Sequence, residues 1–370
     1  MKPSVVVTNY GIGRNSVLLV NQSILEGIEK AGLLAPDGDL TFRGDNPDDR
    51  YKYRSEAASL FSTWLDKHEA PDVLVAQASF AADVFRVAME RCPNTLRVLQ
   101  RDSTHAGYRK RTLDEEYERL GMSVREPAEI TNTELHEYEQ AHAITVLSRY
   151  VERTFRDNGL GHKVRYTSPQ TIDLKRWPVF PRDPDNIRFR VLFGGQIVVR
   201  KAAHQLFEAW RRLEPREDEE LVLAGVVGEP GERADFMNAE MKRTPRVRTE
   251  WRDIYQMWKS YAACDVYCLP SLEEGSSCTC IEALACGRPL VASDCCGSDL
   301  LEQHDDIGML FPAGDVDALT AALQWYREHP DKRVEHGRRA REVAAAAGGM
   351  ERFGSDYARV IVDLWNSRER

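Results

Sequence analysis

Short apolar runs alternate with stretches of helical periodicity along almost the whole chain. The apolar runs lie at residues 4–8, 72–77, 96–100, 143–148 and 163–168, and then at 189–195, 220–225, 265–271, 289–294 and 308–312. Apolar residues recur at helical spacing in 16–31, 78–91, 203–213, 253–263 and 315–328. Because the apolar runs hardly alternate with polar residues, they are typical of parallel sheets covered on both faces. The order of elements predicts an α/β protein with doubly wound parallel sheets.

One segment interrupts this order. Residues 168–189, "SPQTIDLKRWPVFPRDPDNIRF", contain four prolines and several polar residues, which do not continue a sheet or a helix. We therefore predict an N-terminal Rossmann-like domain over 1–168, a linker over 169–187 and a C-terminal Rossmann-like domain over 188–348, with a cleft between the domains. The periodicity of 349–370 predicts a C-terminal helix that packs back on the first domain.

Composition narrows the class of protein. The 370 residues are 42% hydrophobic and 29% charged, which is ordinary for a globular chain. A formal net charge of −9 argues against a nucleic-acid partner, and the basic run "GYRKR" (107–111) is interpreted as a solvated helix end. The start "MKPSVVVTNYGIG" does not resemble a signal peptide, and no apolar run is long enough to span a bilayer. We expect a cytoplasmic protein, with at most peripheral contact at the inner membrane surface.

Seven of the eight cysteines lie between Cys264 and Cys296. Their spacing contains no C-x₂-C pair and no H-x₃₋₅-H partner, so a zinc site is not expected. The thiols fall at small-residue positions of predicted strands and a helix, where they act as compact hydrophobic groups. Three D-x-D pairs, at 37/39, 183/185 and 315/317, are also not expected to bind metal, and Asp315 is interpreted as the N-cap of the following helix.

Glycines follow the first predicted strand. Gly11 and Gly13 in "VVVTNYGIGRNS" allow a tight turn at which a ligand approaches the backbone. The third position of a dinucleotide fingerprint is Ser16, and no acidic residue clearly ends the second strand, so a nicotinamide site is poorly supported. No Walker A loop and no G-x-S-x-G elbow occurs.

The stretch "LEEGSSCTCIEALACGRPL" (272–290) places Glu274 before a predicted helix and Glu282 inside it. Ser276 or Ser277 suits the N-cap, and Gly287 suits the end of the helix. Eight residues of helix span up to ~12 Å, whereas the paired carboxylates of glycosidases are ~5–9.5 Å apart. The two glutamates are therefore interpreted as clamps on either side of one ligand.

The residues between these glutamates can bind an anion. Their backbone N–H groups lie at the start of the predicted helix and form a cradle that suits a diphosphate. These residues are Gly275, Ser276, Ser277, Cys278 and Thr279. The segment "LFGGQIVVRKAAHQLFEAW" adds cations, because Arg200 and Lys201 follow a strand that ends at a pair of glycines.

Together these residues resemble the retaining glycosyltransferases of the GT-B fold, family 4. The resemblance rests on "PSLEEGSSCTCIEALACGRPL", with Glu274 and Glu282 at the two places of the E-x₇-E motif, on "GGQIVVRKAAHQLFEAW" and on "GMLFPAGDVDALTAAL". It extends over the whole chain and is specific mainly between 189 and 325. This chain departs from the family pattern at two positions. Gln196 stands where the family usually has Arg, and Ala202 stands where it usually has Gly.

The resemblance implies a role for each matching residue. It places Lys201 on the diphosphate, Glu282 on the ribose hydroxyls and Glu274 near the transferred sugar. His105 in "RDSTHAG" would lie beside the reacting sugar. The remaining donor-binding positions implied are Gly11, Gly13, Gly195, Gln196, Arg200, Gly275, Ser276, Ser277, Cys278 and Thr279.

The implied activity is hexosyl transfer from a nucleotide sugar, with UDP favoured, to an acceptor hydroxyl. The resemblance implies retention of anomeric configuration, no metal and no other cofactor. The acceptor stays open among a saccharide, a lipid-linked saccharide, a small metabolite and a protein. Two alternatives also stay open, a sugar-nucleotide epimerase on the same fold and a non-catalytic nucleotide-sugar-binding protein.

Overall fold

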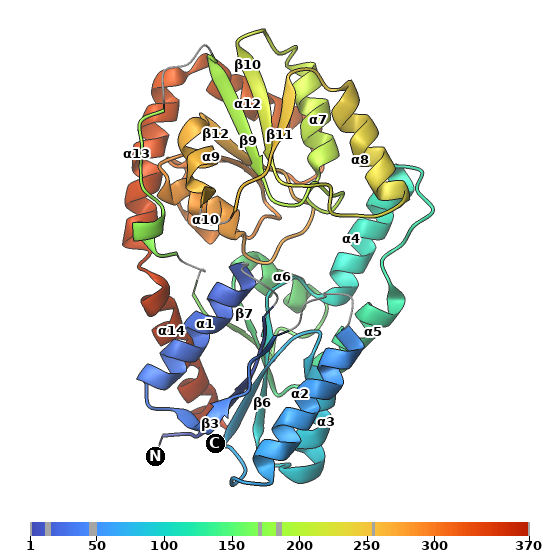
Figure 1. Ribbon diagram of the computed structural model, residues 1–370, viewed down its shortest axis with the longest axis vertical. Helices are drawn as coiled ribbons and strands as arrows, with labels where there is room; N and C mark the ends of the chain where they lie inside the picture. Colours follow the sequence, from blue (N-terminus) through green and yellow to red (C-terminus); the bar gives the residue numbers. More distant parts are fainter. Residues whose placement is uncertain are drawn as a thin grey trace. The chain divides into compact units, whose positions relative to one another are not determined.

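Two six-stranded parallel sheets organise the residues that the structure, a computed structural model, describes: 2–11, 16–43, 50–168, 172–182, 187–253 and 256–368. Each sheet belongs to its own compact unit (Figure 1). The first unit comprises Met1–Lys110, Pro127–Gln170 and Met350–Arg370, and the second comprises Arg111–Glu126 and Thr171–Gly349. The α/β architecture predicted from the sequence is confirmed.

The first sheet has the strand order β3-β1-β5-β6-β7-β8. Its strands are β1 (Val5–Thr8), β3 (Leu34–Asp39), β5 (Val73–Gln77), β6 (Leu96–Arg101), β7 (Ala143–Val146) and β8 (Val164–Tyr166). Every residue of β1, β5, β6 and β7 is buried, whereas the two edge strands also expose residues. The chain reverses its direction of strand addition between β1 and β5, which are neighbours in the sheet. The short strands β2 (Tyr10–Gly11) and β4 (Phe42–Arg43) pair beside this sheet.

Helices cover both faces of the first sheet, with α1 and α14 on one face and α2, α3 and α5 on the other (Figure 1). The helices of this unit are α1 (Ser16–Lys30), α2 (Arg50–Leu65), α3 (Ala81–Arg91), α4 (Ala106–Arg119), which ends in the second unit, α5 (Ala128–Gln140), α6 (Arg149–Asp157) and α14 (Met350–Ser367). The C-terminal helix α14 buries Phe353, Tyr357 and Ile361 in the apolar core of this unit.

Two glycines allow α1 and α14 to cross at close range. A Cβ on Gly354 would lie 2.2 Å from the carbonyl oxygen of Ser23, and one on Gly27 would lie 2.1 Å from that of Gly354. Real Cβ atoms do not approach backbone this closely, so a side chain at either position would force the helices apart. The crossing therefore depends on glycine in both helices.

Gly354→Ala is accordingly expected to lower the free energy of unfolding by about 3 kcal/mol, because overpacking at a rigid backbone contact is costly. Gly349→Ala is the matched control, since a Cβ there would meet no atom within 4 Å. Thermal unfolding of the two variants side by side checks this. Equal melting temperatures would show that the helices separate without cost.

The second sheet has the strand order β11-β10-β9-β12-β13-β14. Its strands are β9 (Phe189–Gly194), β10 (Glu219–Ala224), β11 (Val247–Glu250), β12 (Val266–Leu269), β13 (Leu290–Ser293) and β14 (Gly308–Phe311). All residues of β9, β12 and β13 are buried. The chain adds β10 and β11 on one side of β9 and then returns to place β12 on the other side. The reversal of direction therefore falls between β9 and β12.

The helices of the second unit pack around this sheet in the upper half of Figure 1. They are α7 (Ala203–Arg212), α8 (Glu232–Arg243), α9 (Trp258–Ala263), α10 (Cys278–Ala285), α11 (Asp299–Gln303), α12 (Val316–Glu328) and α13 (Pro330–Ala346), with a 3₁₀ turn at Leu174–Arg176. Asp315 caps α12 by accepting a hydrogen bond from the Ala318 N–H at 2.8 Å, as the sequence predicted.

One segment lies in a different unit from the one that the sequence analysis gave it. Residues 111–126 were assigned to the first domain, but they group with the second unit. The reason is apolar packing, because Leu113, Tyr117 and Met122 belong to the core of the second unit. A hydrogen-bonded pair adds to this, since His204 Nε2 on α7 lies 2.6 Å from Glu116 Oε1.

Candidate functional site

The two loops that carry the predicted donor-binding residues flank the point at which the second sheet reverses direction. One loop, residues 195–202, follows β9, and the other, residues 270–277, follows the neighbouring strand β12. In open α/β sheets, ligands bind outside the carboxyl ends of the strands at such a point. The topology thus brings together residues that lie about 75 positions apart in the sequence.

The turn after β9 needs glycine for two physical reasons. Gly195 adopts φ +114°, which side chains rarely permit, and its N–H donates to the Ala224 carbonyl oxygen at 3.0 Å. A Cβ on Gly225 would lie 1.8 Å from the Gly195 carbonyl oxygen, so the loops after β9 and β10 are in direct backbone contact. Gln196, at the position where the family has Arg, is exposed to solvent beside Gly228.

Ala202, the second departure from the family pattern, adopts a left-handed conformation with φ 50° immediately before α7. This region is strained for residues with a Cβ and unstrained for glycine. The structure therefore explains why glycine suits this position, and Ala202 adopts the same left-handed conformation at the start of α7.

Hydrogen bonds join the loop after β9 to the loop after β12. The Leu272 N–H donates to the Arg200 carbonyl oxygen at 2.9 Å, and Arg200 Nη1 donates to the Glu273 carbonyl oxygen at 2.9 Å. The carboxylate of Glu273, whose side chain is 0% exposed, lies 3.4 Å from the same guanidinium. The two loops are therefore held together before any ligand binds.

Glu274 and Lys201 form the central ion pair of the site. Lys201 Nζ lies 2.9 Å from Glu274 Oε1, and Arg200 Nη1 lies 3.3 Å from the same oxygen. Burial alone would raise the pKa of the Glu274 carboxyl, but the charges of Arg200 and Lys201 outweigh burial and lower the pKa to about 2. Glu274 is thus ionised at every physiological pH and orients both cations.

Helix α10 begins directly after this pair. It starts at Cys278 with Ser277 as N-cap, and the first N–H groups of a helix have no intrahelical acceptor. The Ser277 side chain hydrogen-bonds to the Thr279 hydroxyl at 2.9 Å and does not cap a helix N–H. At the other end, Gly287 has φ +71°, and the Arg288 N–H reaches the Ala283 carbonyl oxygen at 2.9 Å, which closes a Schellman motif.

Glu282 lies on the second turn of α10 in a different electrostatic environment from Glu274. The Tyr261 hydroxyl donates to Glu282 Oε2 at 2.7 Å. Burial raises the pKa of Glu282 to about 7, although the Tyr261 hydrogen bond and the charge of Lys201 oppose this rise. The site therefore holds one permanently ionised glutamate and one that titrates near neutral pH.

Only part of the first unit's predicted site lies within the described residues. Gly11 follows β1 and pairs with Arg43 in the short strands β2 and β4, so it lies at the carboxyl edge of the first sheet. Gly13 lies outside the described residues. The neighbouring strands β1 and β5 are the point at which this sheet reverses direction.

His105 follows β6 and is only 5% exposed. Its ring packs between Tyr138 and Phe155, with ring centroids 5.3 and 5.2 Å away. The Tyr108 N–H lies 3.4 Å from His105 Nδ1 and donates to it, which assigns the ring proton to Nε2. The structure thus fixes the ring and its tautomer from within the first unit.

A buried ion pair holds the loop that carries His105. Arg101 and Glu134, each 1% exposed, form a contact of 3.0 Å, and Arg101 Nη2 also donates to the Thr104 carbonyl oxygen at 2.7 Å. Burial would raise the pKa of Glu134, but Arg101 and Arg109 outweigh burial and lower it to about 2. The pair is therefore ionised, and removing either partner would leave a buried charge.

Two residues of the second unit's site were not identified from the sequence. Glu273 pairs with Arg200, and Tyr261 donates to Glu282. Glu273 could have been noticed as the neighbour of Glu274. Tyr261 carries no signal in the sequence, because its role depends on packing between distant segments.

The described residues contain no group of His, Cys, Asp and Glu side chains arranged to hold a metal ion. All eight cysteines are free thiols. Burial raises the pKa of Cys264 to about 12 and makes that thiol a packing group. Of the D-x-D pairs, 183/185 lies outside the described residues, whereas the Asp37 side chain is 88% exposed beside His68.

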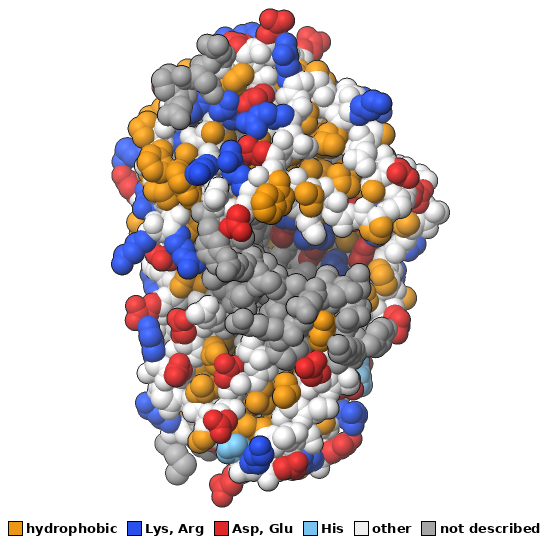
Figure 2. All heavy atoms as spheres, viewed as in Figure 1, with side chains coloured by type: hydrophobic (Ala, Val, Ile, Leu, Met, Phe, Trp, Pro, Cys, Tyr) orange, Lys and Arg blue, Asp and Glu red, His pale blue; other side chains and the backbone are white. Residues whose placement is uncertain are grey.

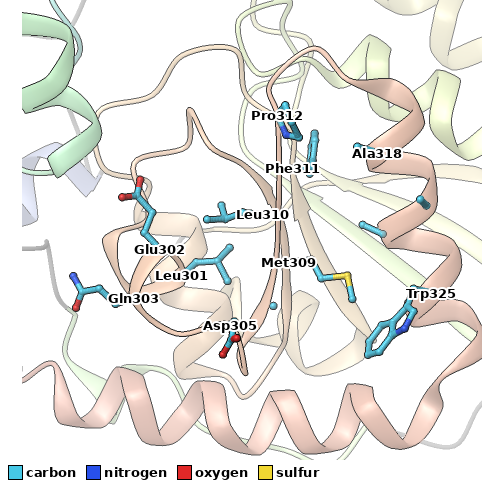
Figure 3. Close-up of a pocket in the computed structure, with 13 residues that line it drawn as sticks. Leu301, Glu302, Gln303, Asp305, Met309, Leu310, Phe311, Pro312, Ala318 and Trp325 are labelled. Atoms are coloured by element: carbon cyan, nitrogen blue, oxygen red, sulfur yellow. The ribbon is translucent and has the colours of Figure 1, made fainter.

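A cavity of about 900 Å³ lies elsewhere in the second unit, along the edge strand β14. Leu310 points toward the α11 side of this strand, whereas Met309 points toward Trp325 on α12 (Figure 3). None of the residues that line this cavity is among the predicted donor-binding residues. The cavity and the paired loops after β9 and β12 are therefore separate features.

Comparison of the whole chain with solved structures identifies its fold. Sucrose-phosphate synthase from Thermosynechococcus elongatus superposes with a TM-score of 0.74 at 18% identity, over 98% of this chain and 100% of that one. HepE from Anabaena, solved in complex with UDP and with UDP-glucose, superposes with TM-scores of 0.68 and 0.67 at 14% identity. In the UDP complex the match covers 97% of this chain and 100% of that one. The fold is GT-B.

Sequence comparisons agree with GT-B in the second unit. Residues 188–329 match the family described as glycosyl transferases group 1. A D-inositol 3-phosphate glycosyltransferase from Xylanimonas cellulosilytica is 30% identical over 181 residues, which is 45% of this chain and 39% of that protein. An MMP alpha-(1->4)-mannosyltransferase from Mycolicibacterium hassiacum is 28% identical over 183 residues, which is 49% of this chain and 44% of that protein. The matches thus span less than half the length of these curated relatives.

Two further observations concern the surface charge of the chain and the apolar character of its helices. Acidic and basic side chains are interspersed on the face shown in Figure 2. None of the helices in the described ranges is both long enough and apolar enough to cross a membrane.

Proposed function

We propose that the chain transfers a hexosyl group from a UDP-sugar to an acceptor hydroxyl. The observation that carries the proposal is the Lys201–Glu274 pair, which lies between the two loops at the reversal point and directly before α10. A cation, the start of a helix and exposed amide donors on Gln196 suit a diphosphate leaving group. The match of residues 188–329 to glycosyl transferases group 1 and the UDP complexes of HepE support this assignment.

The proposed donor-binding roles are those that the family resemblance implies, and the geometry of the second unit supports them. Lys201 and the N–H groups of residues 275–279 would bind the diphosphate, and the Glu282 carboxylate would accept hydrogen bonds from the ribose hydroxyls. Glu274 would orient Lys201 and Arg200 toward the reacting bond. In this proposal Glu274 and Glu282 act as the two glutamates of an E-x₇-E motif.

The proposed reaction retains the anomeric configuration and uses no metal. The bond between the anomeric carbon and the phosphate oxygen breaks as the acceptor oxygen bonds to the same face of that carbon. The acceptor proton passes to the departing phosphate oxygen, and UDP leaves. Lys201 and the helix start stabilise the negative charge that develops on the diphosphate. His105, with its Nε2 proton, would donate a hydrogen bond to the sugar.

The test is incubation of the full chain with UDP-sugars in the presence of EDTA, with and without a mixture of saccharide and polyol acceptors. We expect UDP to be released faster when acceptors are present and the product to show the donor's anomeric configuration by NMR. An isomerised UDP-sugar formed without acceptor would identify an epimerase. No turnover of any donor that binds would identify a binding protein.

Glu282→Gln is expected to weaken UDP binding by about tenfold at pH 8, because a charge-assisted hydrogen bond is lost. The pKa of Glu282 is raised to about 7, so the wild-type carboxylate is ionised above that pH and protonated below it. The difference in affinity between wild type and variant should therefore grow as the pH rises from 6 to 8. Calorimetry checks this, and the titration of UDP itself cancels between the two proteins. A difference that does not change with pH would contradict the role of Glu282.

A further inference from the structure

Three buried aromatic rings form a row inside the second unit. They belong to Trp177, to Tyr261 on α9 and to Tyr267 on β12, and are named here the aromatic row. The Tyr261 ring lies in the middle, with its centroid 5.8 Å from that of Trp177 and 5.5 Å from that of Tyr267. Because rings from two other segments pack against it, the central ring has a fixed orientation.

Hydrogen bonds also fix the backbone of Tyr261. Its N–H donates to the Met257 carbonyl oxygen at 3.2 Å. Its carbonyl oxygen accepts from the Cys264 N–H at 3.2 Å and from the Cys264 thiol at 3.3 Å. With both the ring and the backbone held, the Tyr261 hydroxyl oxygen has one position.

That position is beside the Glu282 carboxylate. The Tyr261 hydroxyl donates to Glu282 Oε2 at 2.7 Å, a short distance that is typical of a hydrogen bond from a hydroxyl to a charged oxygen. Among the described residues, Tyr261 is the only side chain that hydrogen-bonds to this carboxylate. The second carboxylate oxygen, Oε1, is therefore left for a ligand.

The titratable groups that interact with Glu282 come from four elements. They are Lys201 before α7, Tyr261 on α9, Tyr267 on β12 and Cys286 at the end of α10. Lys201, the cation of this set, is itself 2.9 Å from Glu274, and Arg341 on the packed helix α13 donates to two main-chain carbonyl oxygens. Burial raises the pKa of Glu282 to about 7, and the Tyr261 hydrogen bond opposes this rise more than Lys201 does.

We propose that Tyr261 is a positioning residue for the donor, which holds one oxygen of the Glu282 carboxylate and turns the other toward the ribose hydroxyls. The role of Glu282 rests on the proposed function, whereas the action of Tyr261 on Glu282 does not. Tyr261 is 0% exposed and acts through Glu282 without touching the donor. A hydrogen bond to a carboxylate favours its charged form, so Tyr261 also keeps Glu282 able to accept hydrogen bonds at neutral pH.

The first test is a ¹³C NMR titration of the full chain, without ligand, with labelled glutamate carboxyl carbons. Glu282→Gln assigns the resonance by removing it. The pKa of Glu282 should be about 7 in wild type. In Tyr261→Phe this pKa should be about one pH unit higher, roughly the value of one hydrogen bond to a charged group. A pKa that is unchanged or lower in Tyr261→Phe overturns the inference, whether or not UDP binds.

The second test is calorimetry with UDP between pH 6 and pH 9. Tyr261→Phe should bind UDP about threefold more weakly than wild type near pH 7, and less than twofold more weakly at pH 6 and at pH 9. These values follow if protonation of Glu282 weakens binding about tenfold and its pKa rises by about one pH unit. In the Glu282→Gln background, Tyr261→Phe should change UDP affinity less than twofold at every pH. A loss that is the same at every pH would indicate a structural role and contradict the proposal.

The control is Tyr326→Phe, which also removes a buried hydroxyl from the second unit. The Tyr326 side chain on α12 is 0% exposed, and its hydroxyl lies 2.8 Å from His336 Nδ1. This variant should keep the wild-type pKa of Glu282 and the wild-type affinity for UDP, and thermal unfolding shows that both variants are folded.

A wild-type chain that carries 3-fluorotyrosine decides the question even if Tyr261→Phe does not fold. The more acidic hydroxyl is a stronger donor and should lower the pKa of Glu282. A pKa that stays or rises in the fluorinated chain overturns the inference. Failure of wild type to bind UDP would instead contradict the proposed function, and the NMR titrations would still decide this inference.

Discussion

Lys201→Ala is expected to lower the affinity for UDP by 10- to 100-fold, roughly the value of one charged hydrogen bond to a phosphate. The Lys201 side chain is 12% exposed and pairs with Glu274 at 2.9 Å. Arg200 Nη1 lies 3.3 Å from the same carboxylate oxygen and can replace only part of its charge, which limits the expected loss to this range. Turnover should fall further, by about 10²–10³-fold, because charge on the leaving group grows in the transition state. Calorimetry with UDP and initial rates of UDP release measure the two effects separately.

Lys332→Ala serves as the control for this variant. Lys332 belongs to the same unit but lies on the surface of α13, where it pairs with Glu335 at 2.6 Å. Its loss should leave UDP affinity and turnover within twofold of wild type, because exposed ion pairs contribute little. Unchanged UDP affinity in Lys201→Ala would show that the diphosphate binds elsewhere.

Glu274→Gln is expected to reduce turnover by about 10²–10³-fold, a loss typical of a preorganised group that acts on the transition state. UDP affinity should stay equal to wild type or rise. The reason is that Lys201 and Arg200 lose the carboxylate with which they are paired and keep their own charge. Glu274→Gln should therefore lower turnover without weakening UDP binding, whereas Glu282→Gln should weaken UDP binding.

Glu335→Gln is the matched control for Glu274→Gln and should alter neither quantity. The double variant Lys201→Ala/Glu274→Gln adds a second check, because side chains 2.9 Å apart do not act independently. Its loss of turnover should be smaller than the product of the two single losses. A parallel fall of UDP affinity and turnover in Glu274→Gln would make this residue a binding group and contradict its assigned role.

The central strands of each sheet could be predicted from the sequence, as could the edge strands β8 and β14, but the other two edge strands could not. Strands such as β5 and β9 are buried along their whole length, so their apolar runs are a clear signal. The edge strands β3, "LAPDGD", and β11, "VRTE", expose polar residues and were not identified. An edge strand needs no apolar run, because solvent covers part of its surface.

A different physical reason explains the wrong assignment of residues 111–126. Helix α4 runs on through the boundary between the two units, and apolar periodicity does not indicate which core a helix joins. Leu113 and Tyr117 pack instead in a core whose other buried members, apart from Met122, lie from Trp177 onward, so distant residues decide which core they join.

In the site, the sequence predicted the elements but not the contacts. The ends of α10 follow from local rules: Ser276 or Ser277 was predicted as the N-cap and Gly287 as the end of the helix, and the observed helix is Cys278–Ala285 with Ser277 as its N-cap. The pairing of Lys201 with Glu274 and of Tyr261 with Glu282 depends on strand order, which the sequence does not specify. The opposite pKa shifts of the two glutamates follow from these pairings and could not be foreseen.

A crystal structure of the full chain with UDP tests the central claim most directly. The account predicts the diphosphate beside Lys201 Nζ at the start of α10, with the ribose hydroxyls on the Glu282 carboxylate. UDP bound along β14, in the cavity of Figure 3, or at any site that leaves the Lys201–Glu274 pair without a ligand contact, would contradict it.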